Sequence, residues 1–411
     1  MAQQRQHYKY RPQKEYPDGL PWHKEVVRKI EKFNKILFLR LLGKFLRTRP
    51  LDSPIPLEQV SSVLIIRYDA LGDMIVTTPL WRILKRLKPS IKIGVAGSFK
   101  NLDLLRADTD IDILYDYSAA KLKDFFTISK ETRKQKWDVV LMCNFNQKTR
   151  NSIISRLASP HGITATVGSA NVEGHHKLFS RLIRLPLPMN EMPVPSQLQY
   201  LLRQVISLPI SEEERPSIMI DKNVESETLA QIKTILDKTQ STKYIVLNID
   251  APSFKKWTIE KNMELAEFIS GRCTDLTIMI TCLPENRIAL ENILQSRHIE
   301  RLYYFPTLDI HAMTSLIRYS SLVITPDTSI VHLASAENKP VVAFYLSAGE
   351  WLPYKIDSYV ILPKKGEAIS TIPFDVVKKG VIAMLSEEKG ENTYITHIVR
   401  CEDPAQVDIR N

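Results

Sequence analysis

Two short segments of this sequence place polar side chains where a helix should begin. In the first, over residues 62–87, an apolar run leads into RYDALGD and then into a helical pattern. Gly72 allows a tight bend before that helix, and Asp73 could cap the helix or accept a proton from a hydroxyl group. Capping is the commoner role for an aspartate at a helix start, but the pattern alone leaves both roles open.

The second segment, ITPDTSIVHLASA, has the features of an anion site. Its expected helix begins near Asp327, Thr328 and Ser329, so that unpaired backbone N–H groups, two hydroxyls and the positive end of the helix face one point. This arrangement suits a phosphate. His332 follows one turn later on the face of Thr328, although a histidine in an apolar helix is more often a hydrogen-bonded structural residue.

Two further loops carry charged residues after expected strands. Lys255, in the run SFKKW, could neutralise a leaving diphosphate or could be a solvated loop residue. Glu285, in TCLPENR, could accept hydrogen bonds from a ribose or cap the next helix. Ligands of parallel α/β sheets bind outside the carboxyl ends of the strands, so both loops are candidate binding positions.

The elements that must hold these side chains form two series of alternating strands and helices. In the first series a helix is expected over 74–87, with strands at 63–66, 91–96, 111–115 and 139–143. In the second series the strands are expected at 244–249, 276–281, 322–325 and 341–345, with helices at 225–236, 262–272, 287–294 and 329–337. This alternation predicts βαβ units and parallel sheets.

The length of 411 residues suits two domains of common size, and their boundary has a composition signal. A Pro-rich and then acidic stretch over 185–216 surrounds a helical pattern at 197–208. We therefore predict two α/β domains in tandem with a cleft between them. The expected limits are an N-terminal extension over 1–60, a first domain over 61–210, a second domain over 211–390 and a C-terminal tail over 391–411.

The positive charge is concentrated at the N-terminus. The net charge is +10, and residues 1–50 hold 13 Lys or Arg against 4 Asp or Glu, a net +9, which leaves +1 for the rest. A nearly neutral body without a nucleic-acid-binding motif does not indicate a nucleic-acid function, and we expect no such partner.

A basic amphipathic helix is expected over residues 24–49. Apolar side chains recur there at helical spacing among lysines and arginines, namely Val26, Ile30, Phe33, Leu37 and Leu41. Such a helix either docks on the body of the protein or binds an anionic membrane surface, and the sequence favours neither alternative.

The cysteines and the apolar runs indicate a cytoplasmic location. The four cysteines are far apart, form no CxxC pair and mostly lie in apolar runs, which predicts reduced thiols. We see no pattern of a secretory leader and no apolar run long enough to span a bilayer. If the basic helix binds lipid, the protein is expected on the inner face of the inner membrane.

Two other patterns resemble metal sites but are not interpreted as such. Asp108, Thr109 and Asp110 form a DxD motif, which precedes an expected strand instead of following one, so we expect a solvated loop. His175 and His176 are adjacent and therefore cannot share one face of a helix or strand. No metal site is expected.

In order along the chain, four of these features resemble glycosyltransferase family 9, the ADP-heptose:lipopolysaccharide heptosyltransferases. They are RYDALGDMIVTTPLWRILKRLKP, the Lys-x-Trp segment at 255–257, the Pro-Glu turn at 284–285 and ITPDTSIVHLASAENKPVVAFY. The resemblance covers roughly residues 62–362. It implies a GT-B architecture, with two Rossmann-like domains whose parallel sheets face a central cleft. It also implies ADP-heptose as the donor, a lipid-linked lipopolysaccharide core acceptor, and inversion at the anomeric carbon without a metal or other cofactor.

The resemblance implies a role for each candidate residue. Asp73 matches the general base and Lys255 the lysine that holds the diphosphate, while Arg67 and Gly72 would lie on the acceptor side. The remaining matches would bind the donor: Glu285, Asp327, Thr328, Ser329 and His332.

The sequence also departs from the family pattern. Ser329 stands where glycine is usual, Thr258 replaces a common proline, and the basic extension is not part of the family's core. Two other interpretations therefore stay open. One is a GT-B transferase or epimerase that uses another sugar nucleotide, and the other is a non-catalytic GT-B scaffold that docks on a membrane.

Overall fold

The computed structural model describes residues 33–34, 37, 41, 49–117, 122–145, 149–168, 178–186, 188–209, 213–306, 309–386, 394–401 and 407–410. Most of the basic helix expected over 24–49, and the pair His175 and His176, lie outside these residues. Of the expected apolar stripe, Phe33, Leu37 and Leu41 are described. All three are helical, and their side chains are exposed.

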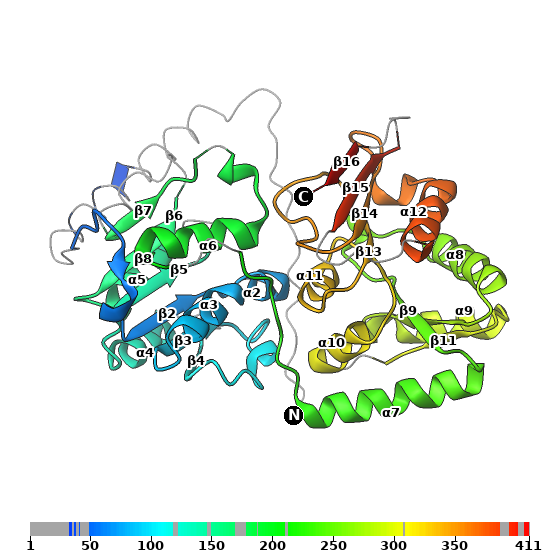
Figure 1. The fold of residues 1–411 in the computed structure, drawn as a ribbon, viewed down its shortest axis with the longest axis horizontal. Coiled ribbons are helices and arrows are strands. Elements are labelled where there is room, and N and C mark those ends of the chain that lie inside the picture. The colour runs from blue at the N-terminus through cyan, green and yellow to red at the C-terminus, as the bar shows by residue number, and fades with distance from the viewer. Residues whose placement is uncertain are drawn as a thin grey trace.

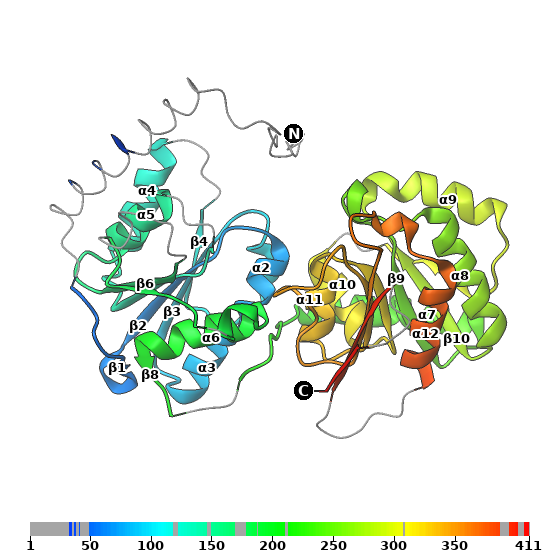
Figure 2. The ribbon, with the colours of Figure 1, turned by 90° about the horizontal axis from the view of Figure 1, so that it is seen from above.

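The first domain contains a parallel sheet between two layers of helices. Its strand order is β4-β3-β2-β5-β6-β7. The strands are β2 (Ser62–Ile66), β3 (Lys92–Gly97), β4 (Ile113–Asp116), β5 (Val139–Met142), β6 (Ile163–Val167) and β7 (Arg181–Ile183). Helices α3 (Pro79–Leu87) and α6 (Val194–Val205) lie on one side of the sheet, with α4 (Leu122–Arg133) and α5 (Thr149–Ala158) on the other (Figure 2). A short parallel pair, β1 (Ile55–Pro56) and β8 (Ile206–Ser207), lies beside them.

The second domain repeats this plan with a larger sheet, in the order β11-β10-β9-β12-β13-β14-β15-β16 (Figure 1). Its strands are β9 (Lys243–Asn248), β10 (Leu276–Thr281), β11 (Leu302–Tyr304), β12 (Val323–Pro326), β13 (Val341–Phe344), β14 (Ser358–Leu362), β15 (Ile395–Arg400) and β16 (Val407–Arg410). Its helices are α7 (Lys222–Thr239), α8 (Ile259–Arg272), α9 (Arg287–Ser296), α10 (Ile310–Arg318), α11 (Ser329–Ala336) and α12 (Phe374–Ser386).

Strands of this sheet are buried on both faces, as expected for strands covered by helices on each side. In β9, Tyr244 and Val246 belong to one hydrophobic cluster, which includes residues of α7, α10 and α11. The intervening Ile245 and Leu247 belong to another, with residues of α8, α9 and α12. This explains why the strands appear in the sequence as continuous apolar runs. The predicted pair of parallel α/β domains is confirmed.

Two expectations about individual elements were wrong. The helix expected over 74–87 is two helices, because α2 (Leu71–Ile75) ends before Pro79 opens α3, a position where proline is well accommodated. The segment 391–411, expected as a tail, instead supplies β15 and β16, which extend the second sheet. Short β-strands carry little periodic signal. β15 pairs in parallel with β14, from which α12 separates it in the sequence, and β16 pairs antiparallel with β15.

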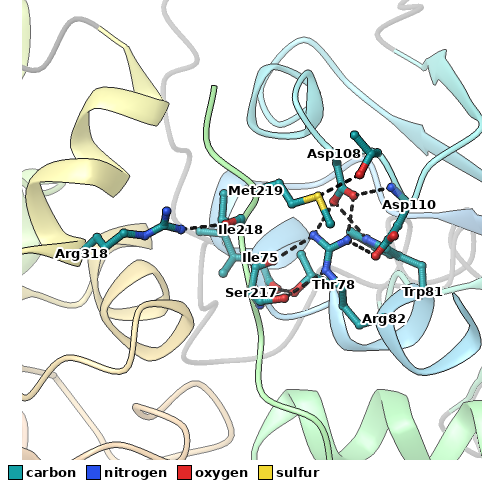
Figure 3. A network of polar contacts seen from close by, with 11 residues as sticks. Ile75, Thr78, Trp81, Arg82, Asp108, Asp110, Ser217, Ile218, Met219 and Arg318 are labelled. Atoms are coloured by element: carbon teal, nitrogen blue, oxygen red, sulfur yellow. Dashed lines mark hydrogen bonds and ion pairs between the residues drawn. The ribbon is translucent and has the colours of Figure 1, made fainter. Parts of the chain in front are cut away.

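The DxD motif proved to be part of an ion-pair network and not a solvated loop (Figure 3). Asp108 is buried and accepts hydrogen bonds from both the Arg82 guanidinium at 2.7 Å and the Trp81 indole at 3.1 Å. Asp110 binds the same guanidinium at 2.5 Å. The two aspartates therefore neutralise a largely buried arginine of α3.

The same arginine holds the segment that joins the two domains. Its Nε donates to the Ser217 hydroxyl at 3.0 Å, and the Ser217 N–H donates to Thr78 Oγ1 at 3.0 Å. One residue later the Ile218 carbonyl accepts from Arg318 of α10 at 3.1 Å. Figure 3 shows the connecting segment passing between these two arginines. The linker is thus bound to the first domain at Ser217 and to the second at Ile218.

No helix among those described is both long enough and apolar enough to cross a membrane.

Candidate functional site

A cavity of about 670 Å³ lies where α2 of the first domain meets α11 of the second. Seven of the residues singled out from the sequence line it: Gly72, Asp73, Lys255, Asp327, Thr328, Ser329 and His332. The structure thus brings together segments that are about 180 to 260 positions apart in the sequence. Arg67 and Glu285 do not line this cavity.

Asp73 makes a capping contact at the start of α2 and also faces the cavity. It is the third residue of α2, and its Oδ2 accepts the Ala70 N–H at 2.8 Å, which satisfies one of the free donors at the helix start. Its Oδ1 accepts from the Arg67 guanidinium at 2.5 Å. The side chain is still partly accessible and faces the cavity. A capping contact and a position from which a proton could be accepted are therefore compatible.

Arg67 lies behind Asp73 and does not line the cavity. Its side chain is only 1% exposed, so the expectation that it faces the acceptor does not fit the structure. One arm of the guanidinium donates to the Cys143 carbonyl at the end of β5, and another binds Asp73. The group lies over the rings of Phe145 and Trp351, at 5.3 and 5.9 Å from their centroids.

Gly72 allows the two domains to touch. A Cβ atom at this position would lie 2.7 Å from His332 Cδ2 and 3.6 Å from the Ser329 Cα. A methyl group at this position would therefore displace either the buried His332 ring or α2 itself. The sequence suggested that Gly72 allows a tight bend before the helix. In the structure, the close approach of His332 is the main reason for a glycine at this position.

The start of α11 carries the predicted anion-binding groups. Thr328 is the N-cap residue, and its Oγ1 accepts the Ile330 N–H at 3.3 Å. The Asp327 carboxylate binds the Lys255 ammonium, which arrives from the loop after β9. Lys255 and the positive end of α11 therefore lie on the same side of the cavity, as an anion site requires.

His332 is buried between the helices and uncharged at neutral pH. Burial lowers the pKa of its imidazole to about 4, and the charges of Asp327 and Asp73 only partly oppose this effect. The ring packs edge-on against Trp351, with centroids 5.9 Å apart. His332 thus acts as a neutral packing group at the domain contact.

Glu285 lies in an exposed turn outside the cavity. The turn is held by Asp250, which accepts the Leu283 N–H at 2.5 Å and the Asn286 side-chain amide at 2.7 Å, and which pairs with Lys256 at 2.7 Å. The sequence reasoning had not singled out Asp250. Asp250 lies two residues after β9, at the carboxyl end of a strand, and this position could have marked it as a candidate.

Comparison with known proteins agrees with this geometry. A sequence profile of glycosyltransferase family 9 (heptosyltransferase) matches residues 125–366, more than half of the chain. The chain belongs to glycosyltransferase family 9. The match begins after the Asp73 segment, which therefore lies outside it.

Three solved structures share the fold of this family 9 glycosyltransferase. A family 9 glycosyltransferase from Veillonella parvula has a TM-score of 0.66 at 17% identity, covering 80% of this chain and 98% of the other. E. coli ADP-heptose lipopolysaccharide heptosyltransferase II gives 0.63 at 18%, covering 79% and 98%. E. coli heptosyltransferase WaaC, solved with ADP, gives 0.60 at 14%, covering 78% and 97%. The GT-B architecture is therefore confirmed. Membership of family 9 identifies the chain as a glycosyltransferase enzyme.

Sequence reasoning missed one wall of the site in this glycosyltransferase. Tyr345 and the loop 347–351 after β13 line the cavity together with the predicted residues. The Tyr345 hydroxyl donates to the Trp351 carbonyl at 2.8 Å, which fixes the loop. The rule that ligands bind at the carboxyl ends of strands applies to β13 as well and could have pointed to this loop.

His332 should make the stability of the enzyme depend on pH. The unfolded chain takes up a proton at the ordinary histidine pKa of 6.5, whereas the folded protein does so only near the lowered value of about 4. Between these values the unfolded state binds more protons, so the free energy of unfolding should fall as pH drops from 6.5 to 4, by on the order of 3 kcal/mol. Urea unfolding across this range should show a much smaller fall for His332→Gln.

The matched control is His298→Gln, which removes an exposed imidazole of the same domain. This variant should keep the wild-type dependence on pH. Parallel curves for wild type and His332→Gln would contradict the assignment of the effect to His332.

Proposed function

We propose that this glycosyltransferase transfers a heptose from ADP-heptose to a lipid-linked lipopolysaccharide core acceptor, with inversion and without a metal. One observation carries the proposal. Asp73 of the first domain and Lys255 with the start of α11 of the second line the same cavity. A proton acceptor and an anion site face each other across it, as a displacement at an anomeric carbon requires. Two of the similar solved structures are E. coli heptosyltransferases, which supports the choice of donor and acceptor.

In the proposed reaction the acceptor hydroxyl binds beside Asp73. The carboxylate takes the hydroxyl proton while the oxygen forms a bond to the anomeric carbon. The bond from that carbon to the diphosphate oxygen breaks on the opposite side, and its electron pair leaves with ADP. The configuration at the anomeric carbon is thereby inverted.

Negative charge then accumulates on the departing diphosphate. The Lys255 ammonium and the N–H and hydroxyl groups at Thr328 and Ser329 are placed to stabilise it. Each such contact contributes roughly 2 to 4 kcal/mol when water is excluded. Ser329, which replaces a usual glycine, keeps a backbone N–H and adds a hydroxyl donor.

The proposed location is the cytoplasmic face of the inner membrane, where a lipid-linked acceptor is present. The exposed apolar stripe of Phe33, Leu37 and Leu41, in a segment rich in lysine and arginine, supports binding to an anionic surface.

Donor and acceptor are tested directly by incubation of the enzyme with ADP-heptose and a panel of truncated core acceptors, with products identified by mass spectrometry. The expected product carries one added heptose. Transfer only from another sugar nucleotide would overturn the donor assignment while leaving the glycosyltransferase class intact.

Asp73→Asn should fold and bind ADP but lose on the order of 10² to 10⁴ in turnover, because an amide cannot accept the proton. Its melting temperature should fall as well, since buried Arg67 loses its carboxylate partner. Asp69→Asn is the matched control, because Asp69 also lies near Arg67, at 4.0 Å, but does not line the cavity. Near wild-type turnover in a folded Asp73→Asn enzyme would rule out the base.

Lys255→Met should weaken ADP binding by about 10- to 100-fold, which corresponds to one lost hydrogen bond to a charged group. Lys256→Met is the control next to it in the chain, because Lys256 pairs with buried Asp250 and does not line the cavity. That variant should lower the melting temperature and change ADP affinity little. Isothermal titration with ADP separates the two outcomes, and equal small effects on affinity would remove the diphosphate role of Lys255.

The exposed stripe is tested by replacing Phe33, Leu37 and Leu41 together with serine. Sedimentation with phosphatidylglycerol vesicles should show weaker binding than wild type, and wild-type binding should fall as salt rises. Phe99→Ser removes an exposed aromatic side chain from the body and should change vesicle binding little. Unchanged binding by the triple variant would contradict the membrane location.

A further inference from the structure

We infer that Arg67 is a positioning residue, which fixes the Asp73 carboxylate for proton transfer and is itself completed by Trp351 of the opposite domain. This inference rests on the proposed function, because it assigns a task to a group behind the proposed base. Arg67 does not line the cavity, so it acts on the reaction only through Asp73.

The guanidinium is anchored to the first sheet. One arm donates to the Cys143 carbonyl, and the Cys143 N–H in turn donates to the Ile66 carbonyl of β2 at 3.0 Å. The other arm reaches Asp73 Oδ1 at 2.5 Å. Since a guanidinium is a rigid planar fork, these two contacts fix its orientation and hence the position of the carboxylate.

The close anionic partner of the Arg67 cation is Asp73. At 1% exposure the cation has left water almost completely, and the Cys143 carbonyl is neutral. Its Nε makes no hydrogen bond within the described residues, and the next carboxylate, Asp69, is 4.0 Å away. Desolvation of a charge is unfavourable unless a close partner compensates it, so the pair holds together strongly.

The second domain supplies one of the two aromatic rings that pack against the Arg67 guanidinium. The guanidinium lies over the rings of Phe145, from the first domain, and Trp351, from the second. Trp351 is fixed by the Tyr345 hydroxyl, and the neighbouring Glu350 carbonyl accepts the Val194 N–H at 2.9 Å. The position of the Asp73 carboxylate therefore depends on Trp351 of the second domain packing against Arg67. The proposed base is in this way linked to the domain proposed to bind the nucleotide.

The decisive variants are Arg67→Met and Arg67→Lys. Arg67→Met should lower kcat by about 10- to 100-fold with the KM for ADP-heptose and the affinity for ADP within about threefold of wild type. Arg67→Lys keeps the charge but not the fork, so it should recover only part of the loss. Asp73→Asn added to Arg67→Met should reduce kcat much less than it does alone, because both act on one step.

Arg156 provides a matched control. It is also a buried arginine of the first domain, and its guanidinium donates to backbone carbonyls of Ser159, Pro160 and Gly162. Arg156→Lys should lower stability and leave kcat unchanged. A fall in kcat of similar size from Arg156→Lys and Arg67→Lys would reduce Arg67 to a structural residue.

Two further measurements keep the inference testable if Arg67→Met does not fold. Trp351→Leu should lower kcat by about 3- to 10-fold in wild type and by less in Arg67→Lys. Independently of activity, the loss of melting temperature in Arg67→Lys/Asp73→Asn should be smaller than the sum of the single losses. Additive losses overturn the positioning role. If the wild-type enzyme shows no transfer at all, the proposed function is overturned instead. The melting temperatures of the single and double variants then still decide whether Arg67 holds Asp73.

Discussion

The close approach of α2 to α11 is the contact on which the site depends. It is possible because residue 72 has no side chain, which leaves room for the imidazole of His332. One hydrophobic cluster continues through this contact, from Val63 and Met74 in the first domain to Val331 and Val246 in the second. Asp73 follows Gly72 directly, and Ser329 lies one turn before His332. The contact that joins the domains therefore also brings the proposed base to the anion site.

The charges of the cavity are paired within each domain before any ligand binds. Arg67 binds Asp73 on one side, and Lys255 binds Asp327 on the other. The two pairs differ in accessibility, since the Arg67 side chain is 1% exposed whereas that of Lys255 is 26% exposed. A diphosphate could therefore compete with Asp327 for the lysine, but a substrate could not displace Asp73 from the arginine. The buried pair is suited to fixing geometry and the accessible pair to exchange of partners.

Sequence patterns located the groups that face the cavity but not the groups that support them. Asp73, Lys255 and Thr328 follow strands whose apolar runs are clear, so the rule for parallel sheets placed them at the carboxyl edges of the two predicted sheets. The burial of Arg67 depends on Cys143 and Trp351, which come from other elements, and no local pattern records those contacts. For the same reason Asp108 was expected in solvent, although Arg82 and Trp81 surround it. Local periodicity predicts elements, whereas the partners of a buried charge depend on how distant elements pack.

The division of the proposed chemistry between two domains has a physical consequence for the competing reaction with water. A sugar nucleotide bound to the second domain alone would meet the diphosphate-stabilising groups without the base. Its hydrolysis would then lack the proton acceptor that activates an attacking oxygen. Only the assembled interface, with Trp351 against Arg67 and Gly72 against His332, presents both halves and limits access of water. In the proposed mechanism, Trp351 of the second domain, the proposed donor domain, packs against Arg67, which binds Asp73. The proposed base would then be fixed only where a bound donor can be attacked.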